Sequence, residues 1–298
     1  MRIEARFYET YDLCAVVSGV LNDRWSHLRK LEGFHCDGQW AFWARPYEKY
    51  SVLHQFIEFI VLDVHQDQAV AVDLDERRQL RAAYADIPEA LKDLRTEKLP
   101  IEEAFEHHDL EHQSFLEFLA EAGKTFEGAD DNDVFDFMAE TRLQEPYGML
   151  IRQTVREVFH VLFQNRELLL TFNHYLSDIL GDANPSEMEE PGMLERFTSS
   201  GTLLRVKPPA WARRAVFFRD HGRCVLCNAD LSGLLNPTNI ENYDHIVPLA
   251  RHGINDVSNL QLLCVPCNQK EKRDRAGMTS CLYQSWYPYD TDPSDSPE

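Results

Sequence analysis

The 298-residue sequence contains no apolar run near the roughly 18 to 20 residues that a membrane-spanning helix requires. Its longest candidate, residues 56–64, is short and carries Glu58 inside it. The first residues lack the apolar core of a signal peptide. We therefore expect a soluble, cytoplasmic protein with no membrane partner. The sequence also has no internal repeat and no long low-complexity tract.

Basic residues are scarce, with 30 Lys and Arg against 50 Asp and Glu and a formal net charge of -20. Taken alone, this acidity argues against a nucleic-acid-binding protein, because phosphate contacts need Lys and Arg. The charge is uneven, however: residues 1–204 hold 19 basic and 39 acidic side chains, whereas residues 205–275 hold 11 basic and 7 acidic ones. The segment 205–275 is therefore the part of the chain whose charge favours contact with nucleic acid.

Cysteine is uncommon and odd in number, with 7 in the chain. An odd count in a sequence without a signal peptide does not suit a disulfide framework. Four of the cysteines form two Cys-x-x-Cys pairs, and four thiolates are enough to close a tetrahedral zinc site. The four are Cys224, Cys227, Cys264 and Cys267. A closed shell leaves no position for substrate, so we predict a structural Zn²⁺ that stabilises a small domain.

Turn-forming residues gather between residues 181 and 209, where Pro, Gly, Ser and Asn recur. The charge changes sign across the same stretch. We predict an acidic, mostly helical domain at residues 1–181 and a linker at residues 182–209. A small domain at residues 210–275 and an acidic tail at residues 276–298 are predicted to follow.

The clearest helical periodicity runs from Ile151 to Ile179, with apolar residues spaced by three or four and an interruption at Asn165. We predict one long helix that packs in the core of a bundle. The alternative is a coiled coil that forms a homodimer, with Asn165 fixing its register. Polar and apolar residues alternate at positions 2–7, which predicts a strand. Further helices are predicted at residues 76–85, 89–94 and 101–122.

Three short motifs lie between and beside the cysteine pairs. They are Asp244-His245-Ile246-Val247-Pro248-Leu249, Asn255-Asp256-Val257-Ser258-Asn259-Leu260 and Pro266-Cys267-Asn268. Together with the cysteines, they resemble the HNH endonuclease family of the McrA type, over residues 210–275. The resemblance implies a ββα-metal domain of the His-Me finger class, and together with the mostly helical N-terminal domain predicted from periodicity this gives an α+β fold. We expect its strands at residues 242–248 and 260–264, and its helix from Pro266.

The resemblance also implies a role for each motif residue. His245 would be the general base that takes a proton from water, and Asn259 would hold the loop that orients it. Asp244 and Asn268 would be ligands of a catalytic divalent ion, Mg²⁺ or Mn²⁺, with Asn268 in the position of the family's final His. His252 adds an imidazole close to the motif, which we interpret as an exposed loop residue.

Four cations follow the last cysteine and are expected to line the helix that begins there: Lys270, Lys272, Arg273 and Arg275. We predict that they contact the phosphates of double-stranded DNA, and the alternative is a solvated basic face. Arg251 is a further candidate of the same kind. Arginines before the first cysteine pair are weaker candidates, because apolar neighbours place part of their helix in the core: Arg213, Arg214, Arg219 and Arg223.

The function that these features predict is a metal-dependent endonuclease that hydrolyses DNA phosphodiester bonds. A restriction or antiphage-defence effector is the setting that we expect, with a regulatory protein or a small-molecule trigger acting on the N-terminal domain. The alternatives are a homing or mobile-element nuclease and a zinc-dependent nucleic-acid-binding module that does not cleave. A further interpretation, a peptidase, rests on His108-x-x-Glu111-His112, which resembles an inverted zinc-protease signature on one helix.

Overall fold

The computed structural model describes residues 2–83, 98–183, 192–233, 241–271 and 277–281. Contacts divide the chain into two compact units. The first comprises Met1–Val17 and His54–His160, and the second comprises Ser18–Leu53 and Val161–Glu298. Among the described residues, no helix has the length and apolar character that crossing a membrane requires. The predicted helix at residues 89–94 lies outside the described residues.

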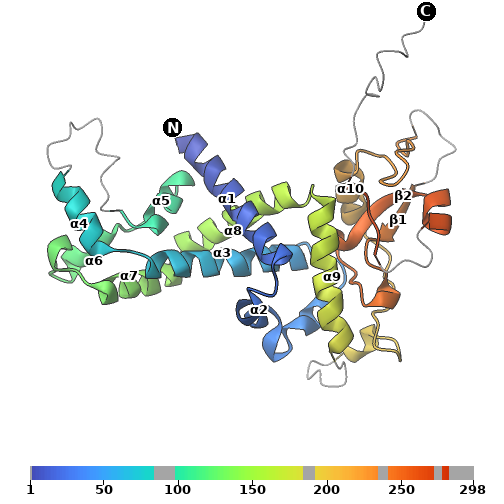
Figure 1. Ribbon diagram of the computed structural model, residues 1–298, viewed down its shortest axis with the longest axis horizontal. Coiled ribbons are helices and arrows are strands. Elements are labelled where there is room, and N and C mark those ends of the chain that lie inside the picture. The colour runs from blue at the N-terminus through green and yellow to red at the C-terminus, as the bar shows by residue number, and fades with distance from the viewer. Residues whose placement is uncertain (1, 84–97, 184–191, 234–240, 272–276, 282–298) are drawn as a thin grey trace, which may run out of the picture. The chain divides into compact units, whose positions relative to one another are not determined.

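The first unit is helical in all its described elements (Figure 1). Its core includes a group of phenylalanine rings, in which Phe115 packs against Phe137 with ring centroids 5.4 Å apart. The mostly helical N-terminal region that the sequence predicts is therefore confirmed. Helices that lie in this unit or share residues with it are α1 (Arg2–Asn22), α3 (Val52–Val70), α4 (Leu74–Ala83), α5 (Pro100–His107), α6 (Phe115–Glu121), α7 (Asp131–Leu143) and α8 (Glu145–Leu162).

The predicted strand at residues 2–7 is wrong, because these residues begin helix α1, which continues to Asn22. An alternation over six residues is too short to distinguish a strand from the start of a helix. The predicted helix at residues 76–85 corresponds to α4.

The predicted single helix at residues 151–179 is also wrong, because the structure breaks it into α8 and α9 (Arg166–Asp182). Asn165 is the N-cap of α9, and its side chain accepts a hydrogen bond from the backbone N–H of Leu168 at 3.1 Å. Most apolar residues of the stripe are buried within the chain, among them Val155, Val158, Leu169, Phe172 and Leu176. These buried side chains are covered within the chain and are therefore not available to a homodimer.

The predicted helix at residues 101–122 is two short helices, α5 and α6, joined by a turn. His108 is the C-cap of α5, and Asp109 has a positive φ of 53°. His108 is buried and bonds the Ala104 carbonyl through Nδ1 at 2.8 Å, whereas the His112 ring stacks on Phe105. The two histidines do not share the face of one helix, so the peptidase interpretation is wrong.

The second unit contains a two-stranded antiparallel sheet of β1 (Glu241–His245) and β2 (Leu260–Cys264) (Figure 1). The second strand has the predicted bounds, and the first ends three residues earlier than predicted. A short π-helical segment, η8 (Cys267–Glu271), follows β2. The α+β fold class is confirmed. The other described elements that lie wholly in this unit are α2 (Leu28–His35), η1 (Cys36–Ala44), α9, η5 (Leu194–Arg196), α10 (Ala210–Arg219), η6 (Leu249–Arg251) and η7 (Val257–Asn259).

Parts of the predicted linker (residues 182–209) and of the predicted tail (residues 276–298) are folded into the second unit. Asn255 donates a hydrogen bond to the Leu204 carbonyl at 2.8 Å and accepts one from the Val206 N–H at 3.3 Å. Near the C-terminus, Met278 donates its backbone N–H to the Ile246 carbonyl at 3.1 Å. The contacts therefore divide the chain differently from the predicted boundaries at residues 181, 209 and 276.

Candidate functional site

The two Cys-x-x-Cys pairs converge in the second unit. The four Sγ atoms of Cys224, Cys227, Cys264 and Cys267 all lie within 4.8 Å of one another. The first pair is held in a tight turn, in which Asn228 has a φ of 60° and donates its N–H to the Cys224 carbonyl at 2.8 Å. The second pair spans the end of β2 and the start of η8. The sequence spacing therefore produces one compact cluster of four sulfur ligands.

This cluster fits a structural zinc ion. Burial raises the pKa of both Cys227 and Cys267 above the usual thiol value, so these thiols stay protonated at neutral pH without a metal. A zinc ion displaces such protons and is bound by the resulting thiolates. Four thiolates give the closed tetrahedral shell of structural zinc, with no position left for substrate.

His245 is the last residue of β1, and Asp244 precedes it. Neighbouring residues of a strand point to opposite faces of the sheet. In the register of the two strands, Asp244 lies opposite Gln261 and His245 lies opposite Leu260. His245 is only 1% exposed, whereas Asp244 is half-buried. The imidazole is thus fixed within the domain, and the carboxylate lies on the other face of the strand pair.

The side chain of Asn259 holds the backbone that follows His245. Its Oδ1 accepts a hydrogen bond from the Val247 N–H at 2.8 Å. Its Nδ2 donates to the carbonyls of Val247 at 3.0 Å and Ile254 at 2.9 Å. Asn259 is fully buried, and its own carbonyl accepts the Ile246 N–H at 2.7 Å. One amide therefore joins both ends of the loop after β1, which suits a residue that positions His245.

Asp256 and Ser258 build the turn that presents Asn259, and sequence reasoning assigned them no role. Asp256 Oδ1 accepts hydrogen bonds from the Ser258 N–H at 2.8 Å and the Ser258 hydroxyl at 2.7 Å. Its Oδ2 accepts the Val52 N–H at 3.1 Å. Burial raises the pKa of the Asp256 carboxyl, and the hydrogen bonds from Ser258 oppose that rise. The signal in the sequence was the Asp-x-Ser spacing, which is typical of a side chain that caps a turn.

Gly253 is required by the close approach of two backbone segments. A Cβ at this position would lie 2.0 Å from the Val247 carbonyl oxygen and 3.0 Å from Asn259 Nδ2. Neither neighbour is the flexible end of a long side chain, so the loop after β1 must move to accept a methyl group.

We expect Gly253→Ala to lower the free energy of unfolding by about 3 kcal/mol, the upper range for overpacking a filled site. The measurement is urea unfolding of both proteins, with Gly233→Ala as the comparison. Gly233 has open space around its Cα but a φ of +75°, so its substitution reports backbone strain without a steric clash. A Gly253→Ala loss no larger than that of Gly233→Ala would contradict this account of the loop.

Asn268 immediately follows Cys267 in η8 and is half-buried, with an amide oxygen of the kind that hard divalent ions accept. Of the predicted phosphate contacts, Lys270 lies in the same segment, and Lys272, Arg273 and Arg275 lie outside the described residues. Arg251 is exposed, and its carbonyl accepts a hydrogen bond from the Ser177 hydroxyl at 2.6 Å. The predicted basic surface is therefore described only at Arg251 and at the backbone of Lys270.

His252 differs from the exposed loop histidine that we predicted. It is half-buried, with a left-handed φ of 58°, and its ring lies against α9. A Cβ at Gly181 of that helix would lie 3.5 Å from His252 Cδ2. The ring thus packs against the end of α9 and is not free in solvent.

Arg219 is a structural residue of the domain, so its interpretation as a weak phosphate contact is wrong. It is 3% exposed and bonds the Asp220 carboxylate through Nε at 2.8 Å and through a terminal nitrogen at 2.9 Å. It also donates to the Leu260 carbonyl at 2.6 Å, while Asp220 accepts the Leu262 N–H at 2.9 Å. This charge-assisted pair therefore connects the end of α10 to the backbone of β2.

Comparison with known proteins gives one family match. The model of the HNH endonuclease family matches residues 224–274, which contain the cysteine cluster, both strands and the loop between them. None of the curated proteins and none of the solved structures matches the chain. Residues 224–274 therefore form an HNH endonuclease domain.

Proposed function

We propose that this protein is a metal-dependent endonuclease that hydrolyses DNA phosphodiester bonds. The observation that carries the proposal is the clamp that the fully buried Asn259 forms on the loop after His245, inside a region that matches the HNH family. A residue of this kind fixes the strand end on which a catalytic base would sit. The four-cysteine cluster beside it supplies the rigidity that a small domain otherwise lacks.

The proposed chemistry assigns one task to each residue. His245 accepts a proton from water, whose oxygen attacks the phosphorus, and the bond to the 3′-oxygen of the neighbouring nucleotide breaks. The leaving oxygen takes a proton from solvent, which gives a 3′-hydroxyl and a 5′-phosphate. Asn259 holds the backbone of His245 in place during this step. Asp244 and Asn268 offer the oxygen ligands for Mg²⁺ or Mn²⁺, and a bound ion would offset negative charge on the scissile phosphate. Arg251, an exposed cation in the loop after β1, is proposed to contact a phosphate of the DNA.

The test is incubation of the purified full-length protein with supercoiled plasmid and Mg²⁺ or Mn²⁺. We expect nicked and then linear DNA, and no product when EDTA removes the catalytic ion. Because the four-thiolate zinc site is closed, brief EDTA treatment followed by fresh Mg²⁺ should restore cleavage. Intact plasmid under every metal and salt condition, with supercoiled, relaxed and single-stranded DNA, would rule out cleavage of free DNA.

A zinc-dependent module that binds nucleic acid without cutting it is the competing function. It predicts retarded migration of DNA in a gel without any product, and the same binding after substitution of His245. A restriction or antiphage-defence setting, and its homing or mobile-element alternative, stay predictions from the sequence.

A further inference from the structure

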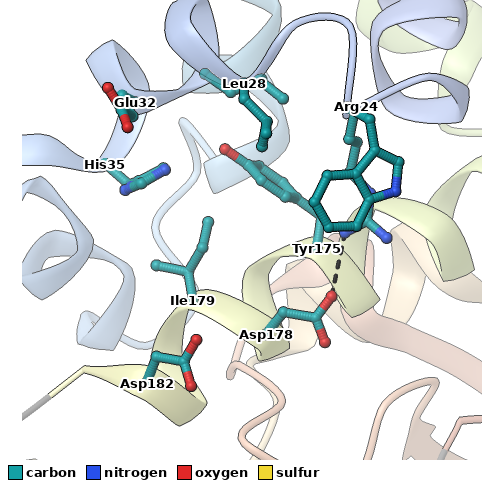
Figure 2. Close-up of a pocket in the computed structure, with 10 residues that line it drawn as sticks. Arg24, Leu28, Glu32, His35, Tyr175, Asp178, Ile179 and Asp182 are labelled. Atoms are coloured by element: carbon teal, nitrogen blue, oxygen red, sulfur yellow. Dashed lines mark hydrogen bonds and ion pairs between the residues drawn. The ribbon is translucent and has the colours of Figure 1, made fainter.

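A cavity of about 350 Å³ lies in the second unit between α2 and α9 (Figure 2). Its walls combine apolar and aromatic surface with carboxylates. Leu28, Glu32 and His35 come from α2, and they face Tyr175 and other residues of α9 (Figure 2). Trp25 also lines the cavity and is 84% exposed. This volume is within the range of small-molecule sites, about 300 to 1,000 Å³.

The charges around the cavity favour a cation. Three carboxylates line it, on Glu32, Asp178 and Asp182, against the single guanidinium of Arg24. In the described part of the chain, the only ion pair among these lining residues joins Arg24 to Asp178, at 3.2 Å. Burial lowers the pKa of His35, although Glu32 opposes the shift, so this imidazole adds no positive charge at neutral pH. An anion such as a nucleotide would meet net negative charge here.

Arg24 shows how a cation sits in this cavity. Its guanidinium carbon lies 5.7 Å from the centre of the Tyr175 ring, while its nitrogen bonds Asp178. The face of the Tyr175 ring and the Asp178 carboxylate thus already hold one planar cation by cation–π attraction and by charge. Asp182 and Glu32 can pair with a second one, and Trp25, Leu28 and Ile179 offer apolar contact to its body.

Helix α9 connects this cavity to the HNH domain. At about 100° per residue, Tyr175, Asp178 and Asp182 fall on one side of the helix, whereas Ser177 and Gly181 fall on a neighbouring side, about a third of a turn away. That second side contacts the loop after β1, through the Ser177 hydroxyl on the Arg251 carbonyl at 2.6 Å and Gly181 against His252. A shift of α9 on one side therefore changes the support of the loop on the other.

Asn173 extends the same contact. Its Nδ2 donates to the Ser258 carbonyl at 3.1 Å, next to the Asn259 amide that holds the backbone after His245. Asn173 and Ser258 are both buried. The helix is thus fixed to both arms of the loop, at Arg251 and at Ser258.

We propose that the cavity between α2 and α9 binds a small organic cation with a planar apolar body, and that its occupancy controls the HNH domain through α9. The control of cleavage rests on the proposed function, whereas the binding does not. Such a ligand would insert its charged group between Glu32 and Asp182 and stack its body beside Tyr175.

The binding test is calorimetric titration of the full-length protein with benzamidine, a planar cation, and with benzamide, its neutral isostere. We expect benzamide to bind at least tenfold more weakly. The double variant Glu32→Gln with Asp182→Asn is expected to weaken benzamidine at least tenfold. The matched control removes the same charges from two exposed residues of α7, through Asp136→Asn with Glu140→Gln, and should bind as the wild type does. The site is overturned if benzamidine and benzamide bind with equal affinity. It is also overturned if benzamidine binds the Glu32→Gln, Asp182→Asn variant as tightly as it binds the control variant.

The coupling test measures plasmid nicking with and without saturating benzamidine. We expect the rate to change at least threefold in the wild type, and this response to disappear in Ser177→Ala while benzamidine still binds. Binding without any change in rate overturns the control through α9 and leaves the site in place. Benzamidine binding by a protein that never cleaves DNA under any condition would contradict the proposed nuclease function instead, because the two readouts are independent.

Discussion

Replacing His245 with alanine is expected to lower the rate of plasmid cleavage by about 1,000-fold, the middle of the range for a general base. The reason is that His245 is the imidazole that ends β1 in the described part of the chain, and water at neutral pH is a poor nucleophile without a base. His252 lies in the same loop, but its ring packs against α9. The measurement is the initial nicking rate at saturating Mg²⁺, compared with that of His160→Ala, an exposed histidine in α8.

Burial of His245 requires a second variant, because a side chain that is 1% exposed also contributes to packing. His245→Gln keeps a polar side chain of similar length but cannot act as a base near neutral pH. We expect both variants to retain their zinc and to lose cleavage to a similar extent. If His245→Gln cleaves at near the wild-type rate while folded, His245 is not the base. Loss of zinc or of cooperative unfolding in both variants would instead identify His245 as a structural residue.

Local motifs were the part of this protein that sequence reasoning could predict. The cysteine spacing indicated one metal cluster, and the four Sγ atoms do meet within 4.8 Å. The bounds of β2 also agree with expectation. The Asn259 side chain bonds the loop after β1, and its proposed part in positioning a catalytic base stays a prediction. Strand alternation and turn chemistry are encoded by short-range geometry. The two cysteine pairs lie 37 positions apart, and they could be brought together in the prediction because four thiolates complete one zinc shell.

Long-range contacts could not be predicted in the same way. The Arg219 guanidinium donates a hydrogen bond to the Leu260 carbonyl, 41 positions away in the sequence. The residues around Arg219 contain no pattern that predicts this partner. The break between α8 and α9 had a local signal in Asn165, but the apolar spacing continues across it because both helices are largely buried. A side chain that can cap a helix and one that can fix a coiled-coil register look the same in sequence.

The attachment of α9 to the HNH domain was also invisible in the sequence. Ser177 and Asn173 belong to a segment that we assigned to the N-terminal domain, yet they bond the loop after β1. The turn-rich stretch at residues 181–209 suggested a boundary because Pro and Gly break helices. A break in secondary structure is not a break in packing, and Leu204 and Val206 from that stretch are hydrogen-bonded to Asn255.

Replacing Cys264 with serine is expected to abolish zinc binding and to disorder the strand pair. Cys264 ends β2, so the missing thiolate opens the closed shell at the position where the sheet meets η8. Structural zinc in small domains contributes about 10 to 16 kcal/mol of binding free energy, which is also folding free energy. The Arg219–Asp220 pair bonds the backbone of β2 at the end of α10, so we expect α10 to stay folded in this variant. We therefore expect loss of the β1–β2 amide protection in hydrogen exchange, with the helices of the first unit still protected.

The matched control is Cys281→Ser, since Cys281 is exposed and lies outside the cluster. Elemental analysis should find about one zinc per chain in the wild type and in Cys281→Ser, as one four-thiolate site requires, and almost none in Cys264→Ser. Protection of β1 and β2 amides that survives in Cys264→Ser would show that packing alone stabilises the strand pair. Zinc retained at the wild-type level in that variant would mean that the cluster does not bind the metal through four thiolates. If the strands become disordered when zinc is lost, the zinc cluster is what holds His245 in place, because His245 ends the strand that pairs with β2.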